Sequence, residues 1–318
     1  MLKTILFTAL LAMASSVSAQ SWPTRPLQLV VPYAPGGVVD FIGRTLGQRL
    51  AQQLGQPVVI DNRPGAGGMI GIEYTARLPA DGHALVIMDP AIVINPVLQE
   101  KSLYDLKDLA TVALVGSSPL VLVVNPALPS ADLAQLVQFA KGSPGKLNFA
   151  SAGIGTTPHM AGELLKLRIG ADMAHVPYKG SGPAMAELVA GQVQLSFSSI
   201  TAALPFIKDG RLRALATTGS KRSPALPEQP TVSEAGYPGF EVDLWLGVFA
   251  PAGTPAQTLA RINSEIRMAV QDPAVGAAFA KVGVEPRSAT AEEGARFVRA
   301  ESEKWARVVT DGKLKTAK

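Results

Sequence analysis

The sequence predicts an α/β fold of two lobes, each built on a mainly parallel sheet flanked by helices. Two stretches, 29–40 and 147–159, share one design, in which a strand ends in a glycine-rich turn that opens a helix. Each half of the chain then repeats the order strand, glycine turn and helix, which is typical of βαβ units in parallel sheets. The first strand, 27–31, is continuously apolar, as expected of a strand that is buried on both faces.

The first half alternates strands and helices from residue 27 onward. The sequence predicts, in order, a strand at 27–31, a helix with Val39, Ile42, Leu46 and Leu50 on one face, a strand at 58–60, a turn at 62–68, a helix containing Ile72 and Ala76, and a strand at 84–88 that ends at Asp89 and Pro90. Gly55 and then Pro57 end the first of these helices.

The second half repeats this order after a crossing between the lobes. We interpret the apolar strand 120–124 as the passage into the second lobe and 240–243 as the return. Between them the sequence predicts a strand at 147–150, a helix with Met160, Leu164 and Leu167 on one face, a strand that ends at 175–177, a turn at 178–182, a helix at 183–190, and a strand at 193–197. After a strand at 246–250, three helices are expected to begin at Thr254-Pro255, Asp272-Pro273 and the capping box of Thr290 with Glu293.

Residues 1–19 have the pattern of a cleaved export signal. Lys3 supplies a positive charge, 5–13 an apolar stretch, and Val17-Ser18-Ala19 a small-residue cleavage site. A permanent membrane helix is the alternative, but this apolar stretch is shorter than the ~20 residues that a span needs. The sequence therefore predicts cleavage after Ala19 and no membrane insertion of the mature chain.

Composition excludes several classes of function. The chain contains no cysteine, which excludes disulfides, thiolate metal sites and cysteine nucleophiles, and an exported protein without disulfides fits a bacterial periplasm. The net charge is +4 without basic runs, and only 6% of the residues are aromatic, so nothing supports nucleic-acid binding. His83, His159 and His175 lack metal-ligand spacing, and no dinucleotide or phosphate-loop motif is present; we therefore expect neither metal nor cofactor.

The glycine turns are candidate sites for a small anion held between the two lobes. A helix start has backbone N–H groups without partners and a partial positive charge, and glycine allows a ligand to approach closely. Pro35, Gly36 and Gly37 would contact the ligand through the backbone, with a plain strand-to-helix turn as the alternative. Asp40 falls in the first turn of its helix, where it would order the loop; contact with a ligand amine is the other possibility.

The second lobe adds hydroxyl groups to its glycine turn. Thr157 is expected to be the N-cap and Pro158 the first helical residue, which leaves one hydroxyl of the Thr156-Thr157 pair for the ligand. His159 is interpreted as a neutral side chain that orders the loop, with ligand contact left open.

Three further side chains are weaker candidates for the site. Lys179, next to Tyr178, would supply a full positive charge, although loop lysines are usually solvated. Ser198 follows a predicted strand at its carboxyl end. Arg63 would form a carboxylate fork or, alternatively, brace its own loop.

Catalytic patterns are weak. Ser143 and Lys146 have a serine-x-x-lysine spacing, but Pro144-Gly145 breaks the helix that would bring the two side chains together. No other pattern places an activated nucleophile beside a base, so we expect no enzyme.

The whole mature chain resembles the Bug-type solute receptors of tripartite tricarboxylate transporters. The resemblance rests on 25–40, on 54–68, on Asp81-Gly82-His83 (where the family usually has an aromatic residue), on 155–164, on 175–180, on 212–216, on Trp245 and on 250–255. It implies a two-lobed periplasmic-binding-protein fold with two crossovers, in which 20–122 and 243–318 form the first lobe and 123–242 the second.

The resemblance also implies how a ligand is held. Carboxylates would be bound mainly by backbone amides, hydroxyls and bridging water near Gly37, Ala66 and Thr156, and the stretch 89–95 would influence ligand choice. Members of the family bind di- and tricarboxylates, amino acids, aromatic acids and neutral vitamins, so the ligand itself stays open. The expected ligand-binding set is Tyr33, Pro35, Gly36, Gly37, Asp40, Ala66, Gly67 and Asp89 from the first lobe, with Ser151, Gly155, Thr156, Thr157, His159, Tyr178, Lys179 and Ser198 from the second.

The predicted function is a monomeric periplasmic receptor that captures a small carboxylate and presents it to transporter subunits in the membrane. Two alternatives stay open. The chain could instead report ligand occupancy to a membrane signalling kinase, or it could be a periplasmic enzyme that acts on a carboxylic acid with His159 as its base.

Overall fold

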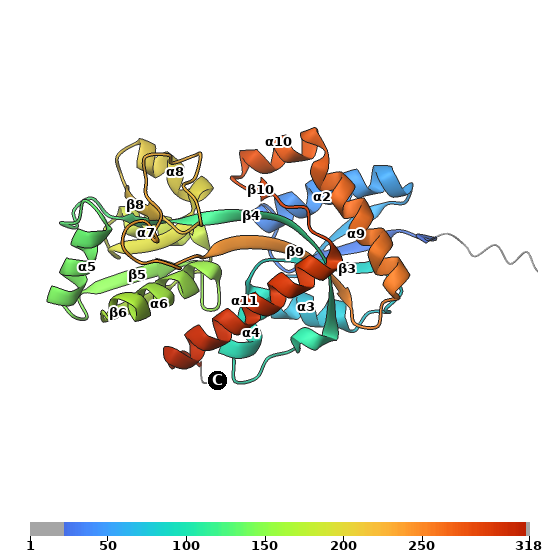
Figure 1. Cartoon of the computed structure of the whole chain (residues 1–318), viewed down its shortest axis with the longest axis horizontal. Coiled ribbons are helices and arrows are strands. Elements are labelled where there is room, and N and C mark those ends of the chain that lie inside the picture. Colours follow the sequence, from blue (N-terminus) through green and yellow to red (C-terminus); the bar gives the residue numbers. More distant parts are fainter. Residues whose placement is uncertain (1–21, 316–318) are drawn as a thin grey trace, which may run out of the picture.

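The computed structural model describes residues 22–315, so the predicted signal peptide at 1–19 lies outside the described residues. Two lobes lie side by side and are joined by long strands (Figure 1). The elements before the crossing are β1 (Leu27–Val31), α2 (Val38–Leu54), β2 (Val58–Asn62), the 3-10 turn η1 (Ala66–Gly68), α3 (Met69–Ala76), β3 (Ala84–Met88), α4 (Ala91–Leu98), η2 (Leu106–Asp108) and β4 (Leu109–Val124).

The second lobe and the return to the first follow β4. The second lobe contains α5 (Leu133–Gly142), β5 (Leu147–Ser151), α6 (Thr157–Ile169), β6 (Met173–Pro177), α7 (Ser181–Val189), β7 (Leu195–Ser199), α8 (Ile200–Lys208) and β8 (Arg213–Thr217). The chain then returns through β9 (Asp243–Pro251), α9 (Ala256–Gln271), α10 (Pro273–Lys281), β10 (Glu285–Pro286) and α11 (Ala291–Asp311).

One mixed sheet extends through both lobes. In the first lobe the strand order is β2-β1-β3-β9-β4, and in the second it is β8-β4-β7-β5-β6. The long strand β4 pairs with β9 from Leu109 to Pro119 and with β7 from Leu120 to Val124. The crossing strand predicted at 120–124 is therefore the second part of a strand that already begins in the first lobe. Its first part, 109–119, is largely apolar up to Val115 and continues into Gly116 and two serines; no strand was predicted there from the sequence.

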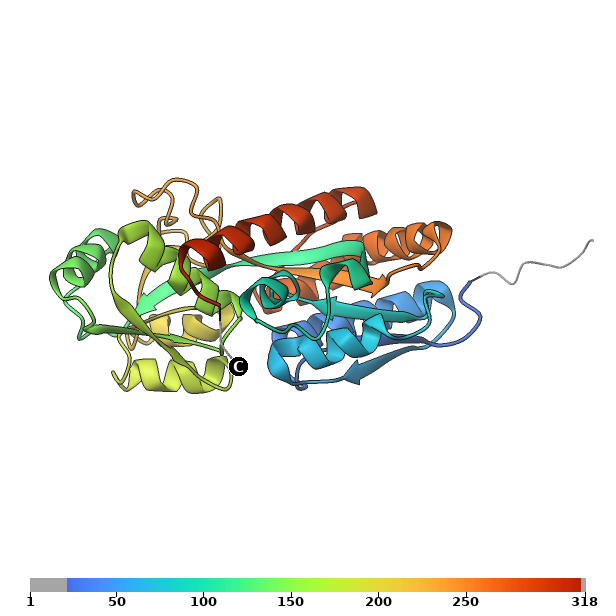
Figure 2. The ribbon, with the colours of Figure 1, turned by 90° about the horizontal axis from the view of Figure 1, so that it is seen from below.

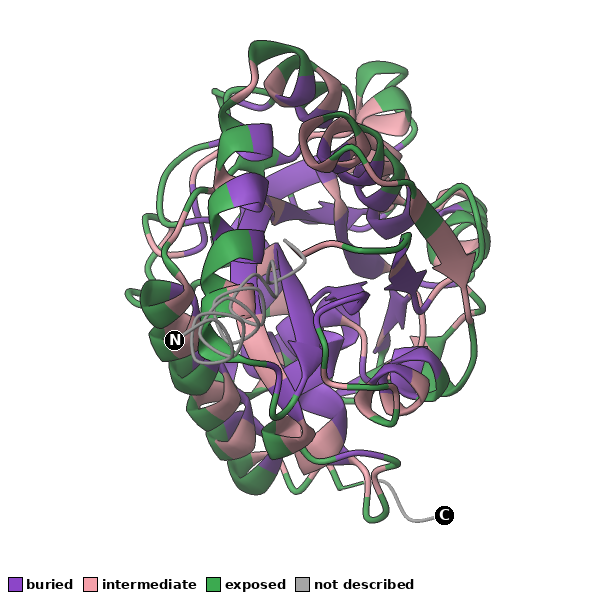
Figure 3. Cartoon of the chain, turned by 90° about the vertical axis from the view of Figure 1, so that its right-hand side faces the viewer, coloured by how far each residue is buried: buried purple, intermediate pink, exposed green. Residues whose placement is uncertain are grey.

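Alternate residues of β1 and β3 pack against different cores. Val30 and Val86 belong to a large cluster that continues through both lobes, whereas Leu29 and Leu85 belong to a second cluster beneath α2, α9 and α10. A third cluster lies beneath α7 and α8. These strands are thus buried on both faces, as their continuous apolar sequence predicted. Figure 3 shows the buried strands enclosed by helices with exposed outer faces.

Each helix forms where its apolar face can be buried. In α2 the predicted residues Val39, Ile42, Leu46 and Leu50 are all buried, and Gly55 ends the helix in the left-handed conformation. Burying each large side chain contributes about 1.5–3 kcal/mol. The helix predicted at 183–190 begins two residues earlier, at Ser181, because proline is tolerated throughout the first turn and need not mark its first residue.

The last helix, α11, extends across both lobes (Figures 1 and 2). It contacts α4 and β4 as well as α6 of the second lobe. Its buried Glu301 accepts hydrogen bonds from the indole N–H groups of Trp245 (3.0 Å) and Trp305 (3.2 Å) and forms an ion pair with Lys304. This carboxylate therefore satisfies two buried donors at the place where α11 covers the crossing strands.

Candidate functional site

Strand direction decides where the glycine turns lie. β9 is antiparallel to β4, and β3 is antiparallel to β9, so β3 and its parallel neighbours β1 and β2 point toward the second lobe. β7 is antiparallel to β4 and parallel to β5, which is parallel to β6, so these strands point back toward the first lobe. The turns that follow the parallel strands of the two lobes therefore face each other (Figure 2). We call the facing turns 33–37, 65–68 and 151–157 the inter-lobe site.

Asp40 orders the first turn. Its carboxylate accepts hydrogen bonds from the Gly36 N–H (2.9 Å), from Nε of Arg44 (3.0 Å) and from Nδ2 of Asn62 (2.9 Å). Burial by itself would raise the pKa of Asp40, but these hydrogen bonds lower it below its usual value. The ordering role predicted for Asp40 is confirmed. Pro35, Gly36 and Gly37 are exposed.

Consecutive left-handed residues shape the second turn of the first lobe. Gly65, Ala66, Gly67 and Gly68 all have positive φ, at 130°, 48°, 64° and 93°, a conformation that favours glycine. The side chain of Asn95, in α4, donates from Nδ2 to the Gly67 carbonyl at 3.0 Å and so fixes the turn.

Arg63 braces its own loop. Its Nε donates to Asp61 at 2.6 Å, and its guanidinium lies 3.5 Å from the centroid of the Tyr74 ring. Of the two roles considered for Arg63, the structure therefore has the loop-bracing one.

Asp89 is buried between Tyr33 and the start of α4. Tyr33 Oη donates to Asp89 Oδ2 at 3.0 Å, and the Ala91 N–H donates to Oδ1 at 2.9 Å. Burial raises the pKa of Asp89 despite these two hydrogen bonds. Both carboxylate oxygens thus already have protein partners.

The second-lobe turn places Thr156, and not Thr157, at the N-cap of α6. Thr156 has extended backbone, and its hydroxyl donates to the Gly153 carbonyl at 2.7 Å. The predicted N-cap at Thr157 is wrong by one residue, because the hydroxyl of Thr156 closes the turn and lets the helix begin at Thr157. Thr157 is fully buried, and its Oγ1 has no hydrogen-bond partner among the described residues.

Two stacked histidines are hydrogen-bonded to the second-lobe turn. His159 Nδ1 accepts from the Gly155 N–H at 3.2 Å, and His175 Nε2 lies 2.6 Å from Ser151 Oγ. The two imidazole centroids are 4.0 Å apart. The loop-ordering role predicted for His159 is thus confirmed, whereas His175 was considered only as a metal ligand. Its place in β6 opposite Phe149 is set by strand register, which the sequence does not specify.

Burial keeps both imidazoles neutral. Burial first, and then repulsion from Lys166 and from a protonated His175, lowers the pKa of His159 to about 3. Burial and the charge of Lys166 likewise lower the pKa of His175 to about 4. At neutral pH each ring therefore offers one donor and one acceptor.

The remaining candidates of the second lobe differ in burial. Ser198 is part of β7, and its buried hydroxyl has no partner in the described part of the chain. Tyr178 is partly buried, and its N–H donates to the Ser151 carbonyl at 3.0 Å. Lys179 is exposed in the same turn.

The two lobes touch at a glycine of the inter-lobe site. A Cβ placed on Gly155 would lie 2.6 Å from Oδ1 of Asn95, and one on Gly67 would lie 3.9 Å from the carbonyl oxygen of Ile154. Around Gly36 and Gly37, in contrast, no atom would lie within 4 Å of such a Cβ. In the described conformation the two lobes therefore approach each other closely at Gly67 and Gly155, whereas the turn at 36–37 has free space around it.

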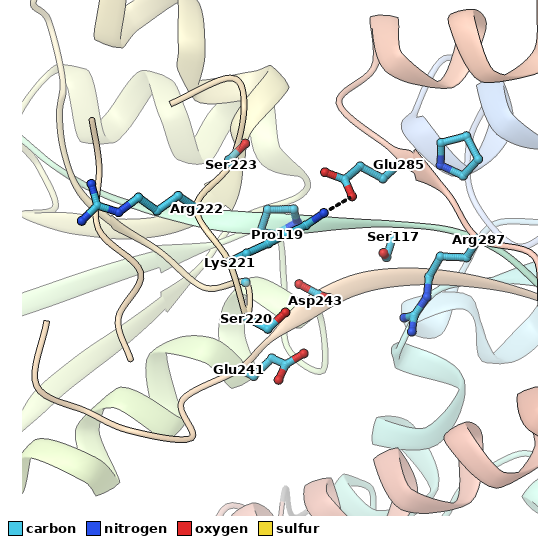
Figure 4. A pocket seen from close by; sticks show the side chains of 12 residues that line it. Ser117, Pro119, Ser220, Lys221, Arg222, Ser223, Glu241, Asp243, Glu285 and Arg287 are labelled. Carbon is cyan, nitrogen blue, oxygen red and sulfur yellow. Dashed lines mark ion pairs between the residues drawn. The ribbon is translucent and has the colours of Figure 1, made fainter. Parts of the chain in front are cut away.

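A separate cavity of about 190 Å³ lies beside the crossing strands. Figure 4 shows its lining, in which Lys221 of the second lobe pairs with Glu285 of the first at 3.3 Å. Asp243 Oδ1 is buried there without a partner in the described chain. Burial, and next the charge of Glu241, raises the pKa of Asp243 to about 6. No predicted ligand-binding residue lines this cavity.

Among residues 22–315 no cluster of three or more histidine or acidic side chains is arranged to hold a metal ion. The same residues include no helix with the length and apolar character that a membrane crossing requires.

A sheet divided between two lobes, two crossing strands and opposed glycine turns define a two-lobed periplasmic binding protein. Residues 42–314 match the family described as "Tripartite tricarboxylate transporter family receptor", and the chain belongs to this family of solute receptors. It is 41% identical to protein BugT of Bordetella pertussis over 315 residues, which cover 98% of this chain and 97% of BugT.

Two solved structures with bound ligands are similar over nearly the whole chain. R. palustris Rpa4515 with adipate is 35% identical, with a TM-score of 0.82, and the match covers 92% of this chain and 98% of Rpa4515. MatC from Rhodopseudomonas palustris with bound malate is 32% identical, with a TM-score of 0.79, and the match covers 91% of this chain and 100% of MatC.

Proposed function

We propose that the chain is exported by cleavage after Ala19 and that it binds a small dicarboxylate at the inter-lobe site, as a monomer that then delivers this ligand to a tripartite transporter. The solved relatives carry adipate and malate, which are both dicarboxylates. A dicarboxylate has one anionic group for each of two opposed turns.

The observation that carries this proposal is a pair of buried hydroxyls without partners. Thr157 Oγ1 and Ser198 Oγ are both inaccessible to water and lack a hydrogen bond to any described residue. A buried polar group without a partner costs about 1–3 kcal/mol. Both lie near the carboxyl ends of parallel strands, and Thr157 opens a 13-residue helix without a side-chain cap. A ligand carboxylate would supply the missing acceptor. Its negative charge would also interact favourably with the N-terminus of α6.

Backbone amides and hydroxyls suffice for binding. A hydrogen bond to a charged group contributes about 1.5–3 kcal/mol, and micromolar affinity corresponds to about 8 kcal/mol. Two or three such bonds at each end of a dicarboxylate would therefore offset the cost of association. Closure would follow because the ligand contacts both lobes only in the closed form.

The geometry argues against the enzyme alternative. His159, the base that such an enzyme would use, already accepts the Gly155 N–H at Nδ1 and has a pKa lowered to about 3 by burial. A base with this pKa has little driving force for proton abstraction at neutral pH. We therefore infer capture of the ligand without turnover.

A thermal-shift experiment on the purified mature chain tests the proposal. Adipate, malate and citrate are compared with 1,6-diaminohexane, a dication with the same chain length as adipate. We expect at least one carboxylate to raise the melting temperature in proportion to occupancy, and the diamine to have no effect. A shift with uncharged compounds alone, or with none of the acids, would overturn the carboxylate assignment.

Matched variants connect the binding to the two hydroxyls. Thr157→Val and Ser198→Ala should reduce the ligand-induced shift while leaving the unliganded melting temperature unchanged or higher. Ser130→Ala is the control, because the buried hydroxyl of Ser130 also has no hydrogen-bond partner in the described part of the chain, but Ser130 lies between β4 and α5 and not at the carboxyl ends of the parallel strands. Loss of ligand uptake in a deletion strain would support delivery to a transporter; intact uptake with lost kinase signalling would favour the sensor alternative.

A further inference from the structure

We propose that His175 and His159 act together as positioning residues: their stacked rings hold the turn 151–155 in the conformation in which it faces the ligand. Neither side chain needs to touch the ligand for this role. The inference rests on the proposed ligand site between the lobes, and it gives a role to His175, which was not among the expected ligand-binding residues.

The first support is a hydrogen bond that fixes the tautomer of His159. Because the Gly155 N–H donates to Nδ1 at 3.2 Å, the ring proton of neutral His159 must be on Nε2. Gly155 has φ of +78° and contacts Asn95 of the opposite lobe. His159 therefore holds the residue at which the two lobes meet.

The second support is the bonding of Ser151. Its hydroxyl accepts from the Gly153 N–H at 3.1 Å and donates to the Gly153 carbonyl at 3.1 Å. His175 Nε2 lies 2.6 Å from the same oxygen. The Gly153 carbonyl also accepts from the Thr156 hydroxyl at 2.7 Å, so the bond between Ser151 and His175 runs in the direction that the tautomer of His175 sets. His175 thus completes the bonding at the start of the turn.

The third support is the contact between the rings. The centroids of His159 and His175 are 4.0 Å apart, and the Phe149 ring stacks on His175 at 4.8 Å. Glu163 lies 3.9 Å from Nε2 of His159 and is already paired with Lys166 at 3.0 Å. His159 stays neutral in this setting, because a proton on its Nδ1 would oppose the Gly155 N–H. The pair therefore acts as one support, in which each ring is hydrogen-bonded to one end of the turn.

Conservative and disruptive variants separate positioning from general packing. His159→Asn keeps an acceptor at the place of Nδ1, and His175→Gln keeps a group that can donate or accept at the reach of Nε2, whereas His159→Leu and His175→Leu remove these groups. Phe149→Leu is the control, because it loosens the same stack without removing a hydrogen bond to the turn. With adipate and malate as probes in titration calorimetry, we expect the two leucine variants at the histidines to bind at least tenfold more weakly than wild type, and the Asn and Gln variants to stay within about threefold.

An NMR measurement without ligand tests the same inference independently. In the wild-type chain, the ¹⁵N spectrum of the histidine rings should show His159 protonated at Nε2 only, and the Gly155 amide should exchange slowly. In His159→Leu this exchange should accelerate, while Phe149→Leu should leave it slow. A proton on Nδ1 of His159, or equal affinity loss in Phe149→Leu and the histidine variants, would overturn the positioning role. If wild type bound neither acid, the dicarboxylate proposal would fail, and the NMR arm alone would decide the role of the histidines.

Discussion

Gly155→Ala tests whether closure of the lobes depends on contact between the turn 151–157 and α4. Gly155 has φ of +78°, and the new Cβ would lie 2.6 Å from Oδ1 of Asn95 in the opposite lobe. The left-handed backbone costs about 1–2 kcal/mol for alanine in open and closed forms alike. The steric overlap, in contrast, exists only when the lobes touch. Substitution should therefore lower stability and, separately, disfavour the closed form.

The cost to the closed form follows from what must move. Asn95 can avoid the methyl group by rotating, which breaks its 3.0 Å hydrogen bond to the Gly67 carbonyl and leaves a buried amide without a partner. This costs about 1–3 kcal/mol, and with a central value of about 2 kcal/mol the apparent Kd for a ligand that requires closure rises roughly 30-fold.

Calorimetric titration with the best acid from the thermal-shift screen measures this effect. Gly170→Ala is the control, because Gly170 has φ of +63° but no atom within 4 Å of its added Cβ. The melting temperature should fall by a similar amount in both variants, and only Gly155→Ala should bind the ligand more weakly. Adding Asn95→Ala to Gly155→Ala should restore part of the binding. Equal affinity in Gly155→Ala and Gly170→Ala would refute the contact between lobes as a determinant of closure.

Three further substitutions test the carboxylates described above. Glu301→Ala should lower the free energy of unfolding by about 2–5 kcal/mol, because two buried indole N–H groups lose their acceptor; denaturant titration with Glu301→Gln as control should show a smaller loss, and equal losses would contradict this. For Asp243, burial raises the pKa from 3.8 to about 6, so the folded state binds the proton more tightly and stability should fall as pH rises through this interval. Asp243→Asn should reduce the dependence of the melting temperature on pH in this interval. An unchanged slope would contradict the raised pKa of Asp243. For Asp40, the hydrogen bonds lower the pKa below 3.8, so its contribution is present above that pH and lost in acid; Asp40→Asn should lower the melting temperature at neutral pH and have little effect at acid pH, whereas a parallel loss at both would contradict the assignment.

Local patterns predicted most of the elements, but not α4, α5, α8, β8, β10 or the first part of β4. Helices such as α2 and α11 were predictable because apolar spacing and caps are properties of neighbouring residues. The first part of β4, from Leu109 to Pro119, pairs with β9 and β10, and these distant partners cannot be read from the sequence at 109–119. The N-cap of α6 was misplaced by one residue because the competing bond of the Thr156 hydroxyl to Gly153 depends on the shape of the turn.

The site was predictable in kind and incomplete in detail. Glycine turns and Asp40 are visible in the sequence, since conformational freedom and a carboxylate in a first helical turn are local features. Asn95 was included only in the stretch 89–95 expected to influence ligand choice, and His175 was given no role in the site, because each acts on a residue far away in the chain, Gly67 and Ser151 respectively.

By itself the sequence determined that two similar units carry glycine-rich helix starts suited to an anion, because spacing and residue type control local conformation. Only the tertiary structure decided that these starts oppose each other, because the antiparallel pairing of β4 with β9 and β7 sets the direction of every other strand. The contact of Gly155 with Asn95 and the stacking of two histidines likewise follow from strand register and lobe placement, which depend on the whole chain.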